Sequence, residues 1–286
     1  MRLLLAAGLA MVAFAANSVL NRSALSGGGV DPVAFGLLRL VAGAAVLASL
    51  ALLRGKSLKF GGTGRAIGAA AMLVYVFGFS LAYLHLDAGL GALILFGCVQ
   101  VTMFGGALGA GERVPPLRWA GALIAFAGLI WLLWPGTGSA LGPAPVAAPA
   151  MAVAGAAWGV YSLAGRRGGD PLAGTAANFV AAAGVAVIGS GVIALWSGAG
   201  ALQMDARGAA LAVLSGAVTS GLGYALWYSV LPRLTAAGAG AAQLSVPVIA
   251  MAGGAVFLGE AITRDFILGA VIVLGGVALS LGRRGR

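Results

Sequence analysis

The sequence contains very little charge. Only 8% of its 286 residues are charged, against roughly 25% in ordinary soluble domains, whereas 61% are hydrophobic and the mean hydropathy is +1.04. A chain of this composition has too little polar surface to cover its apolar groups in water. This excludes a soluble globular protein and predicts a polytopic membrane protein surrounded by the lipid bilayer. Because a helix needs roughly 20 apolar residues to cross a membrane, the chain has room for about ten helices.

Cysteine and histidine are nearly absent as well. The lone Cys98 lies within an apolar run, which excludes both a disulfide framework and a cysteine-based metal site. The one histidine, His85, is expected to be an interfacial residue at the outer end of a span. The tripeptide at 55–57 resembles the end of a nucleotide-binding loop, but Leu50 stands where that loop requires glycine. We therefore expect no enzyme activity, no cofactor and no metal site.

The apolar stretches also lack acidic residues. All seven carboxylates of the chain lie at or near the ends of these stretches, within reach of water. A transporter that exchanges a proton for a cationic drug usually needs a carboxyl group near the middle of the membrane, where ionisable groups are functional by default. The lack of such a group argues against strong proton coupling and against a cationic substrate.

Ten apolar segments divide the chain, and none shows the period-two alternation of a membrane β-strand. We predict an all-α fold with ten transmembrane helices at about 3–20, 33–53, 66–84, 88–110, 118–134, 147–165, 173–196, 208–231, 238–258 and 266–281. Thirteen of the 17 basic residues then fall on one side of the membrane, three on the other, and Arg39 within a span. The positive-inside rule places both termini in the cytoplasm of a bacterial inner membrane protein. These loops account for the net charge of +10, so we expect no nucleic-acid partner.

The two halves of the chain resemble each other. With a shift of 148 residues, positions 105–128 and 253–276 align without a gap and share nine identities, including a Gly-Glu pair in each copy. We therefore predict two five-helix repeats, at residues 1–138 and 139–286. An odd number of helices per repeat inverts the second copy, and inverted repeats are typical of secondary transporters that work by alternating access. The alternative is a duplicated membrane scaffold that transports nothing.

Several short motifs fit one family of transporters. They are Phe14-Ala-Ala-Asn17, Asp31-Pro32 followed by Arg39, the two Gly-Glu pairs, and Pro247 ahead of Glu260. Together they resemble the EamA-type members of the drug/metabolite transporter superfamily over essentially the whole chain. Trp158, Tyr161 and the segment 224–227 are most similar to the YddG-type exporters of aromatic amino acids. The resemblance implies export through a site enclosed by the first, third, fourth, sixth, eighth and ninth spans. One departure is Val99, which stands where the second half has Pro247.

Neutral polar and aromatic side chains near mid-span are the best candidates for substrate contacts. Tyrosine and tryptophan normally gather at membrane interfaces, so those in mid-span need a partner such as a hydrated cavity. The predicted substrate-binding residues are Asn17, Tyr75, Phe79, Phe96, Gln100, Trp158, Tyr161, Tyr224, Trp227, Tyr228, Gln243 and Ser245. Pro247 lacks an amide proton, so the carbonyl group of Gln243 loses its helical partner. That carbonyl group either binds substrate or merely marks a kink.

Arg39 is the one full charge well inside a span, and we assign it, with Pro247, a structural or gating role. A charge near the bilayer centre is costly, so it must be paired, hydrated or extended toward the surface. It either contacts a substrate carboxylate or bonds to loop and backbone carbonyl groups at the outer rim. We expect the second arrangement, because long basic side chains reach toward the interface.

These features together predict a monomeric secondary transporter that exports small neutral or zwitterionic metabolites. The aromatic, uncharged cavity favours amino acids with aromatic or large apolar side chains. A broad exporter of drugs and other hydrophobic compounds would use the same kind of cavity and stays an alternative, as does the non-transporting scaffold.

Overall fold

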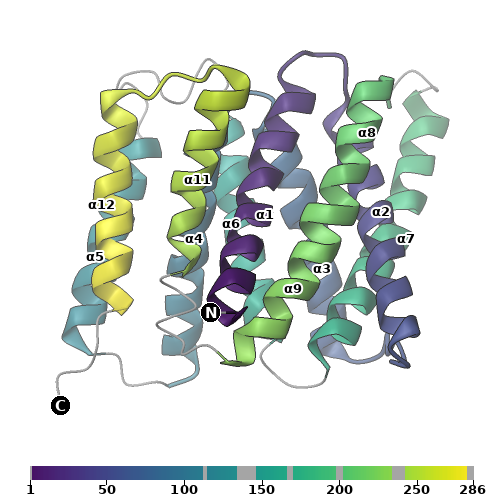
Figure 1. Ribbon diagram of the computed structural model, residues 1–286, viewed down its shortest axis with the longest axis horizontal. Helices are drawn as coiled ribbons and strands as arrows, with labels where there is room; N and C mark the ends of the chain where they lie inside the picture. The colour runs from purple at the N-terminus through teal and green to yellow at the C-terminus, as the bar shows by residue number, and fades with distance from the viewer. Residues whose placement is uncertain are drawn as a thin grey trace.

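The computed structural model describes residues 2–111, 115–133, 146–165, 170–197, 202–233 and 242–281, and within these ranges it is helical with no strand. The helices of the first half are α1 (Arg2–Leu25), α2 (Pro32–Leu53), α3 (Thr63–Ala82), α4 (Ala88–Gly109) and α5 (Pro116–Leu133). Those of the second half are α6 (Ala147–Gly165), α7 (Pro171–Ser197), α8 (Ala206–Leu214), η2 (Ser215–Leu222), α9 (Gly223–Val230), η3 (Leu231–Arg233), α11 (Ser245–Gly253), η4 (Gly254–Leu258) and α12 (Arg264–Leu281). The helices stand side by side in one bundle (Figure 1).

Carboxylate side chains begin several helices. Asp31 precedes α2, and its Oδ1 accepts hydrogen bonds of 2.9 Å from the amide groups of Val33 and Ala34. The proline after it takes the first helical position, where an amide donor would have no helical partner. Asp170 and Asp205 cap α7 and α8 in the same way. The expectation that carboxylates lie at helix ends is confirmed for all those that the structure describes.

Helices far apart in the sequence pack against each other throughout the bundle. α3 lies along α6, α2 along α7, and α5 along α12. α1 contacts α11 and the continuous helix formed by α8, η2 and α9, while α4 contacts α6 and α11. The α5–α12 pair forms one side of the bundle and the α2–α7 pair the other (Figure 1). The centre is therefore enclosed by helices from both halves of the chain.

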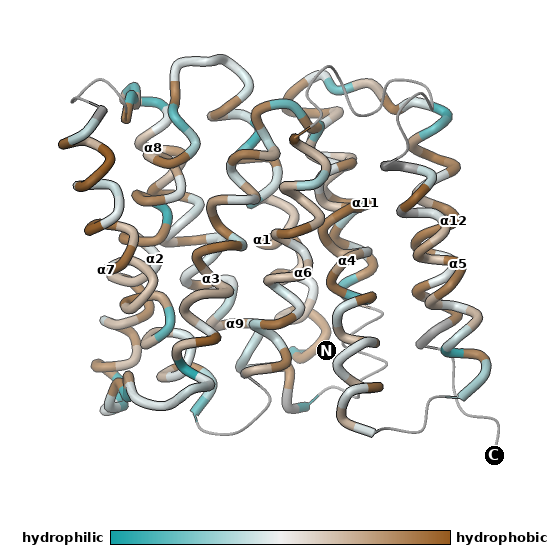
Figure 2. Tube along the Cα trace, turned by 180° about the vertical axis from the view of Figure 1, so that it is seen from behind, coloured by the Kyte–Doolittle hydropathy of each residue, from teal (hydrophilic) through white to brown (hydrophobic). Residues whose placement is uncertain are grey.

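The outer surface of the bundle is apolar. Seven described helices are long and apolar enough to cross a membrane, namely α1, α2, α3, α4, α6, α7 and the continuous helix at 206–230. Leu195 and Trp196 are each 89% exposed and Phe257 is 77% exposed. Hydrophilic residues gather mainly toward the two ends of the helices (Figure 2). Such a surface suits lipid rather than water, so the chain is a multi-pass membrane protein.

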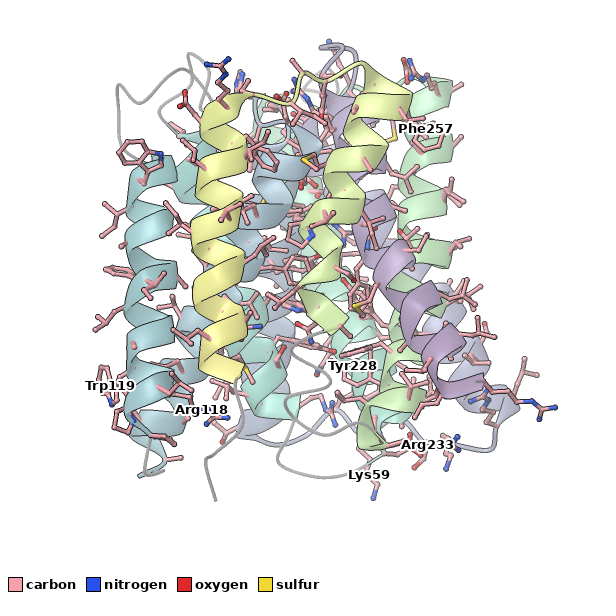
Figure 3. The ribbon with its side chains drawn as sticks, turned by 60° about the vertical axis from the view of Figure 1, so that its left-hand side comes forward. Lys59, Arg118, Trp119, Tyr228, Arg233 and Phe257 are labelled. Atoms are coloured by element: carbon pink, nitrogen blue, oxygen red, sulfur yellow. The ribbon has the colours of Figure 1, made fainter. Side chains whose placement is uncertain are left out.

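The first helix begins and the last helix ends toward the same side of the bundle. The N-terminal end of α1 and the C-terminal end of α12 lie at the lower end of the bundle in Figure 1. Lys59, Arg118 and Arg233, all assigned to the cytoplasm from the sequence, lie at this lower end as well (Figure 3). The clustering of these cations on one face is the arrangement that the positive-inside rule describes.

The helix of the eighth predicted span has an irregular centre, and the ninth is interrupted. α8 passes into the π-helical segment η2 and then into α9 without a break. In the ninth span, Ala242 and Gln243 are helical, Leu244 is a turn and α11 begins at Ser245. Pro247 is therefore the third residue of a helix, where an amide proton would find no helical acceptor. The carbonyl group of Gln243 lies ahead of this break.

The glycines of the two Gly-Glu pairs have the same backbone conformation. Gly111 follows α4 with φ +74° and Gly259 follows η4 with φ +68°, the left-handed conformation that commonly ends a helix. Glu112 itself, the boundary of the predicted repeats at 138/139 and the first residues of the ninth span lie outside the described residues.

Candidate functional site

A small cavity lies at the centre of the bundle among α1, α3, α4, α6 and α9. The cavity has a volume of about 10 Å³, which is room for about one water molecule. The lining residues are Phe14, Asn17, Ser18, Tyr75, Phe79, Leu95, Phe96, Trp158 and Tyr224. Both halves of the chain thus contribute to one enclosure.

Aromatic rings make up most of the cavity wall. The ring of Trp158 lies 4.9 Å from that of Tyr75 and 5.0 Å from that of Tyr224, and it stacks on Tyr161 at 5.2 Å. Phe14 meets Tyr224 edge-on at 5.4 Å. Offset and edge-to-face contacts of this kind are the favourable geometries for aromatic pairs. Because the rings of the wall come from α1, α3, α4, α6 and α9, they join the two halves of the chain around the cavity.

The polar side chains Asn17 and Ser18 of α1 line the cavity, and the π-helical segment η2 supplies hydrogen-bond partners to Asn17. The Oδ1 atom of Asn17 accepts a hydrogen bond of 2.8 Å from the Ser215 hydroxyl and another from the Thr219 hydroxyl. The Asn17 amide donates to the Ser220 hydroxyl at 3.4 Å. Backbone bonds of a π-helix join residues five apart, so the fourth and the fifth residue after Ser215 both lie near it. This geometry brings three hydroxyl groups to one amide.

Arg39 lies inside the bundle, where it is 1% exposed. Its Nε donates to the Ser220 hydroxyl at 3.1 Å and its Nη2 donates to the Tyr75 hydroxyl at 3.0 Å. The expectation that Arg39 bonds to carbonyl groups at the outer rim is therefore wrong. The physical reason is that α2 packs so closely on η2 that a Cβ at Gly216 would collide with the backbone carbonyl of Arg39. The hydroxyl groups of Ser220 and Tyr75 are therefore within reach of the Arg39 guanidinium inside the bundle.

The structure brings half of the predicted substrate-binding residues to the cavity. Those that line it are Asn17, Tyr75, Phe79, Phe96, Trp158 and Tyr224. Tyr161 and Trp227 are buried one layer behind, against Trp158 and Phe14. Those that do not line it, and are half-buried, are Gln100, Tyr228, Gln243 and Ser245. Tyr228 lies toward the lower end of the bundle (Figure 3).

The sequence analysis missed several residues of the site. Phe14 and Ser18 line the cavity but were not among the predicted contacts. They are four residues apart on one helical face together with Asn17, so a search around Asn17 at helical spacing would have found them. Ser215 and Thr219 are also four residues apart, but nothing in the local sequence shows that their helix packs beside Asn17.

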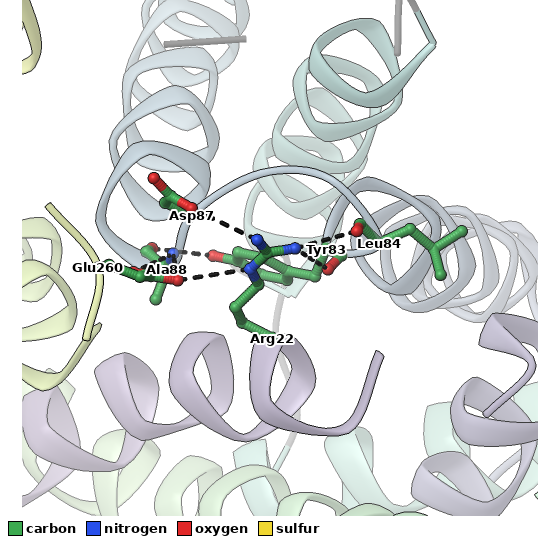
Figure 4. A network of polar contacts seen from close by, with 6 residues as sticks. All are labelled: Arg22, Tyr83, Leu84, Asp87, Ala88 and Glu260. Atoms are coloured by element: carbon green, nitrogen blue, oxygen red, sulfur yellow. Dashed lines mark hydrogen bonds and ion pairs between the residues drawn. The ribbon is translucent and has the colours of Figure 1, made fainter. Parts of the chain in front are cut away.

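At the upper end of the bundle, Arg22 joins three segments of the chain (Figure 4). Its Nη1 donates to the carbonyl groups of Tyr83 and Leu84, at 3.3 and 2.9 Å, where α3 ends. Its Nη2 lies 3.5 Å from Asp87 Oδ1, and its Nε lies 3.4 Å from Glu260 Oε1. The guanidinium therefore satisfies carbonyl groups that a helix end leaves free and pairs with carboxylates from both halves.

Glu260 acts as the N-terminal cap of α4. Its two carboxylate oxygens accept from the amide of Ala88 at 3.1 and 2.9 Å, whereas the side chain of Asp87 makes no cap bond. Burial raises the pKa of Glu260 above its usual range, although the Ala88 amide and Arg22 oppose this effect. The approach requires glycine at Gly254, because a Cβ there would collide with the carboxylate.

The described residues can bind a ligand through hydrogen bonds, aromatic rings and charge. In the described ranges no three histidine, cysteine or acidic side chains gather as a metal site needs. The thiol of Cys98 is half-buried in α4, and His85 is exposed between α3 and α4.

Comparison with known proteins gives a family match. Residues 146–282 match the EamA-like transporter family, and an uncharacterized protein of Pseudomonas aeruginosa is 47% identical over 99% of this chain and 96% of its own length. The second half of the chain is therefore similar to the EamA-like transporter family. The resemblance seen in the sequence motifs is confirmed for this half at the level of the family, and the narrower likeness to exporters of aromatic amino acids stays a prediction.

The fold of the chain recurs in a solved structure. A protein known from a crystal structure is 22% identical and matches 96% of this chain and 94% of its own, with a TM-score of 0.65. The architecture of the bundle is therefore one that has been observed experimentally. The match to a transporter family suggests transport of small molecules across a membrane.

Proposed function

We propose that this protein carries small neutral or zwitterionic metabolites, foremost amino acids with aromatic or large apolar side chains, by alternating access. The composition of the cavity wall carries the proposal: rings such as Tyr75 and Trp158 line it together with the polar side chains of Asn17 and Ser18. Rings suit an apolar side chain. The amide and hydroxyl groups suit the ammonium and carboxylate groups of an amino acid.

The pattern of helix packing supports two inverted repeats. If α1 to α5 correspond to α6, α7, the continuous helix at 206–230, α11 and α12, the most extensive helix contacts have counterparts. α6 packs on α3 and α4, as α1 packs on the helix at 206–230 and on α11. The pairs α2–α7, α4–α11 and α5–α12 each join corresponding helices. Two near-equivalent halves around one site are what an exchange between two mirrored conformations requires.

The cavity is too small for a substrate in the conformation described. About 10 Å³ is room for one water molecule, whereas ligand pockets span roughly 300 Å³ or more. Substrate binding therefore requires the helices around the cavity to move apart. Close contacts at small residues favour such sliding: a Cβ at Gly155 would collide with the carbonyl group of Leu95, so α6 lies directly against the backbone of α4.

The direction and energetics follow from charge and topology. We place the lower end of the bundle, with Lys59, Arg118 and Arg233, in the cytoplasm of a bacterial inner membrane (Figure 3). Within the described residues the buried interior contains no carboxylate, which supports downhill transport without strong proton coupling. The resemblance to amino-acid exporters favours export by a monomer.

Flux into proteoliposomes tests the proposal. Labelled phenylalanine and tryptophan are compared with threonine and an organic cation, with and without a pH gradient. We expect phenylalanine and tryptophan flux that ignores the gradient and falls at least tenfold in Trp158→Ala. The matched control is Trp196→Ala, which removes the same side chain from a position that is 89% exposed at the end of α7, and it should transport normally.

The other outcomes separate the alternatives. Gradient-driven movement of the organic cation with a flat response to amino acids would favour a drug exporter. No flux of any compound, although the protein is folded and inserted, would favour the scaffold. Equal losses in Trp158→Ala and Trp196→Ala would mean that the cavity is not the transport site.

A further inference from the structure

The interior of the bundle contains an arginine that no acidic side chain neutralises. Arg39 is the one charged residue among the buried side chains that the structure describes. The ion pairs formed by the described residues are those of Arg22 with Asp87 and Glu260, and of Lys56 with Asp170. A guanidinium remains protonated at any physiological pH, so its charge persists inside the bundle.

The contacts of Arg39 leave one of its nitrogens free. Nε donates to Ser220 and Nη2 to Tyr75, but the buried Nη1 has no partner. The guanidinium carbon lies 5.2 Å from the ring centre of Tyr75 and 4.9 Å from that of Phe79. Hydroxyl oxygens and ring faces compensate a cation in part, but they supply no negative charge. Burying a charge and a donor this way is unfavourable unless a partner arrives.

The unpaired charge lies one side-chain layer from the cavity. Tyr75 and Phe79 line the cavity and both contact the guanidinium. Ser220 accepts hydrogen bonds from both Arg39 and the cavity residue Asn17. The hydroxyl of Tyr224, another lining residue, donates to Tyr75 at 3.3 Å. A movement of the ring of Phe79 or Tyr75 that opens the cavity would therefore expose the guanidinium to its contents.

We propose that Arg39 binds a carboxylate group of the substrate, so that a carboxylate is required for recognition. This inference rests on the proposed function and narrows it. The free Nη1 offers two N–H donors, and charge-assisted hydrogen bonds from a guanidinium to a carboxylate are among the strong ones in proteins. Substrate binding would neutralise the buried charge at the step in which the cavity opens and closes. The same positive charge repels amines and organic cations.

A series of ligands that share one ring tests the requirement without altering the protein. Phenylalanine, 3-phenylpropionate, phenylethylamine and 3-phenylpropanol are added to the purified full-length protein, and the shift in melting temperature and the inhibition of labelled phenylalanine flux are measured. We expect the two carboxylates to bind at least tenfold more tightly than the amine and the alcohol. The series leucine, 4-methylpentanoate and isopentylamine is measured alongside.

Substitution of Arg39 then locates the effect. Arg39→Gln keeps donors but loses the charge, and we expect its affinity for carboxylates to fall at least tenfold while that for the alcohol is unchanged. Arg39→Lys should recover part of the difference. Arg207→Gln is the matched control, because Arg207 is an exposed arginine whose guanidinium donates to the Ser23 hydroxyl.

Each result decides one question. Equal binding of amine, alcohol and carboxylate by the wild-type protein, or protection by no carboxylate of either series, would overturn the role of Arg39. Arg39-dependent binding of the aliphatic carboxylates alone would uphold that role and refute the preference for aromatic substrates. A poorly folded Arg39→Gln leaves the wild-type ligand series as the decisive measurement.

Discussion

Arg22 and Arg39 both reach from the first half of the chain to the second, but their charges are balanced in different ways. Arg22 lies at the upper end, where Asp87 and Glu260 pair with it and carbonyl groups of α3 accept its remaining hydrogen bonds. Arg39 is buried and has only hydroxyl groups and rings around it. A charge that the protein itself neutralises serves to hold helices together. A charge without an anion is available to a ligand.

The largest effect on stability is expected from Arg22→Ala. The substitution leaves the carboxylate of Glu260, which is 12% exposed, without its cation and the end of α3 without a donor. Removing one partner of a largely buried pair is strongly destabilising, here by about 3 kcal/mol. Thermal unfolding in detergent measures the loss. The control Arg207→Ala should change stability by less than about 0.5 kcal/mol, and a similar loss in both variants would contradict the special role of Arg22.

Tyr75→Phe, which removes a partner of Arg39, should reduce stability less than Arg22→Ala does. It removes the acceptor of Arg39 Nη2 and the partner of the Tyr224 hydroxyl, and leaving a buried donor unsatisfied costs about 1–3 kcal/mol. Tyr161→Phe is the matched control, because that hydroxyl makes a long bond of 3.4 Å to Thr175 and none to Arg39. Ligand rescue sharpens the comparison: saturating phenylalanine should restore more stability to Tyr75→Phe than to Arg22→Ala.

The pH dependence of stability should arise from Glu260 at the upper end of the bundle. Burial raises the pKa of Glu260 in the closed structure, whereas a hydrated carboxyl group would have its ordinary pKa of about 4.3. The closed form therefore binds the proton more tightly, and its extra stability is complete below about pH 4 and is lost as the pH rises through the raised pKa.

Spin labels at His85→Cys and Ile262→Cys, in a Cys98→Ser background, measure whether the helices at the upper end move apart. The distance between them should increase as the pH rises. Glu260→Gln has no carboxyl group to titrate, so its distance should not depend on pH. A pH response that persists in Glu260→Gln would assign the titration to another group.

The smallest effect is expected at the lower end, where Lys56 Nζ lies 2.8 Å from Asp170 Oδ2. Both side chains are exposed to solvent, and such pairs contribute about 0–1 kcal/mol. The Lys56 contact and the amide of Ala173 lower the pKa of Asp170, so its contribution is present above about pH 4 and is lost as the pH falls through the lowered value. Asp170→Asn keeps the cap oxygen and should shift thermal unfolding only slightly, and less still at high salt.

Much of the architecture could be predicted because it depends on local properties. Apolar runs, the capping aspartates Asp31 and Asp205, and the glycines of the Gly-Glu pairs mark helices and their ends through neighbouring residues only. Mid-span aromatic residues such as Tyr75, Trp158 and Tyr224 could be singled out in the same way, and they line the cavity.

The partners of each polar side chain could not be read from local patterns. Gln100, Gln243 and Asn17 are all amide side chains within apolar stretches, yet of the three only Asn17 lines the cavity. The π-helical turn of η2 depends on packing against α1 and α2, and no propensity of Ser, Gly or Thr indicates it. Glu260 was correctly assigned to a helix end, but it caps α4 rather than a helix next to it in the chain.

The sequence by itself determined that this chain is a bundle of apolar helices in a membrane, with its cations on one face and aromatic residues at its centre, because composition and spacing act over a few residues. Only the tertiary structure decided that Arg39 meets Tyr75 and Ser220, which lie 36 and 181 residues away along the chain. The same is true of Arg22 and Glu260. A buried charge takes its partners from whichever helices pack beside it, and that choice is made by the fold as a whole.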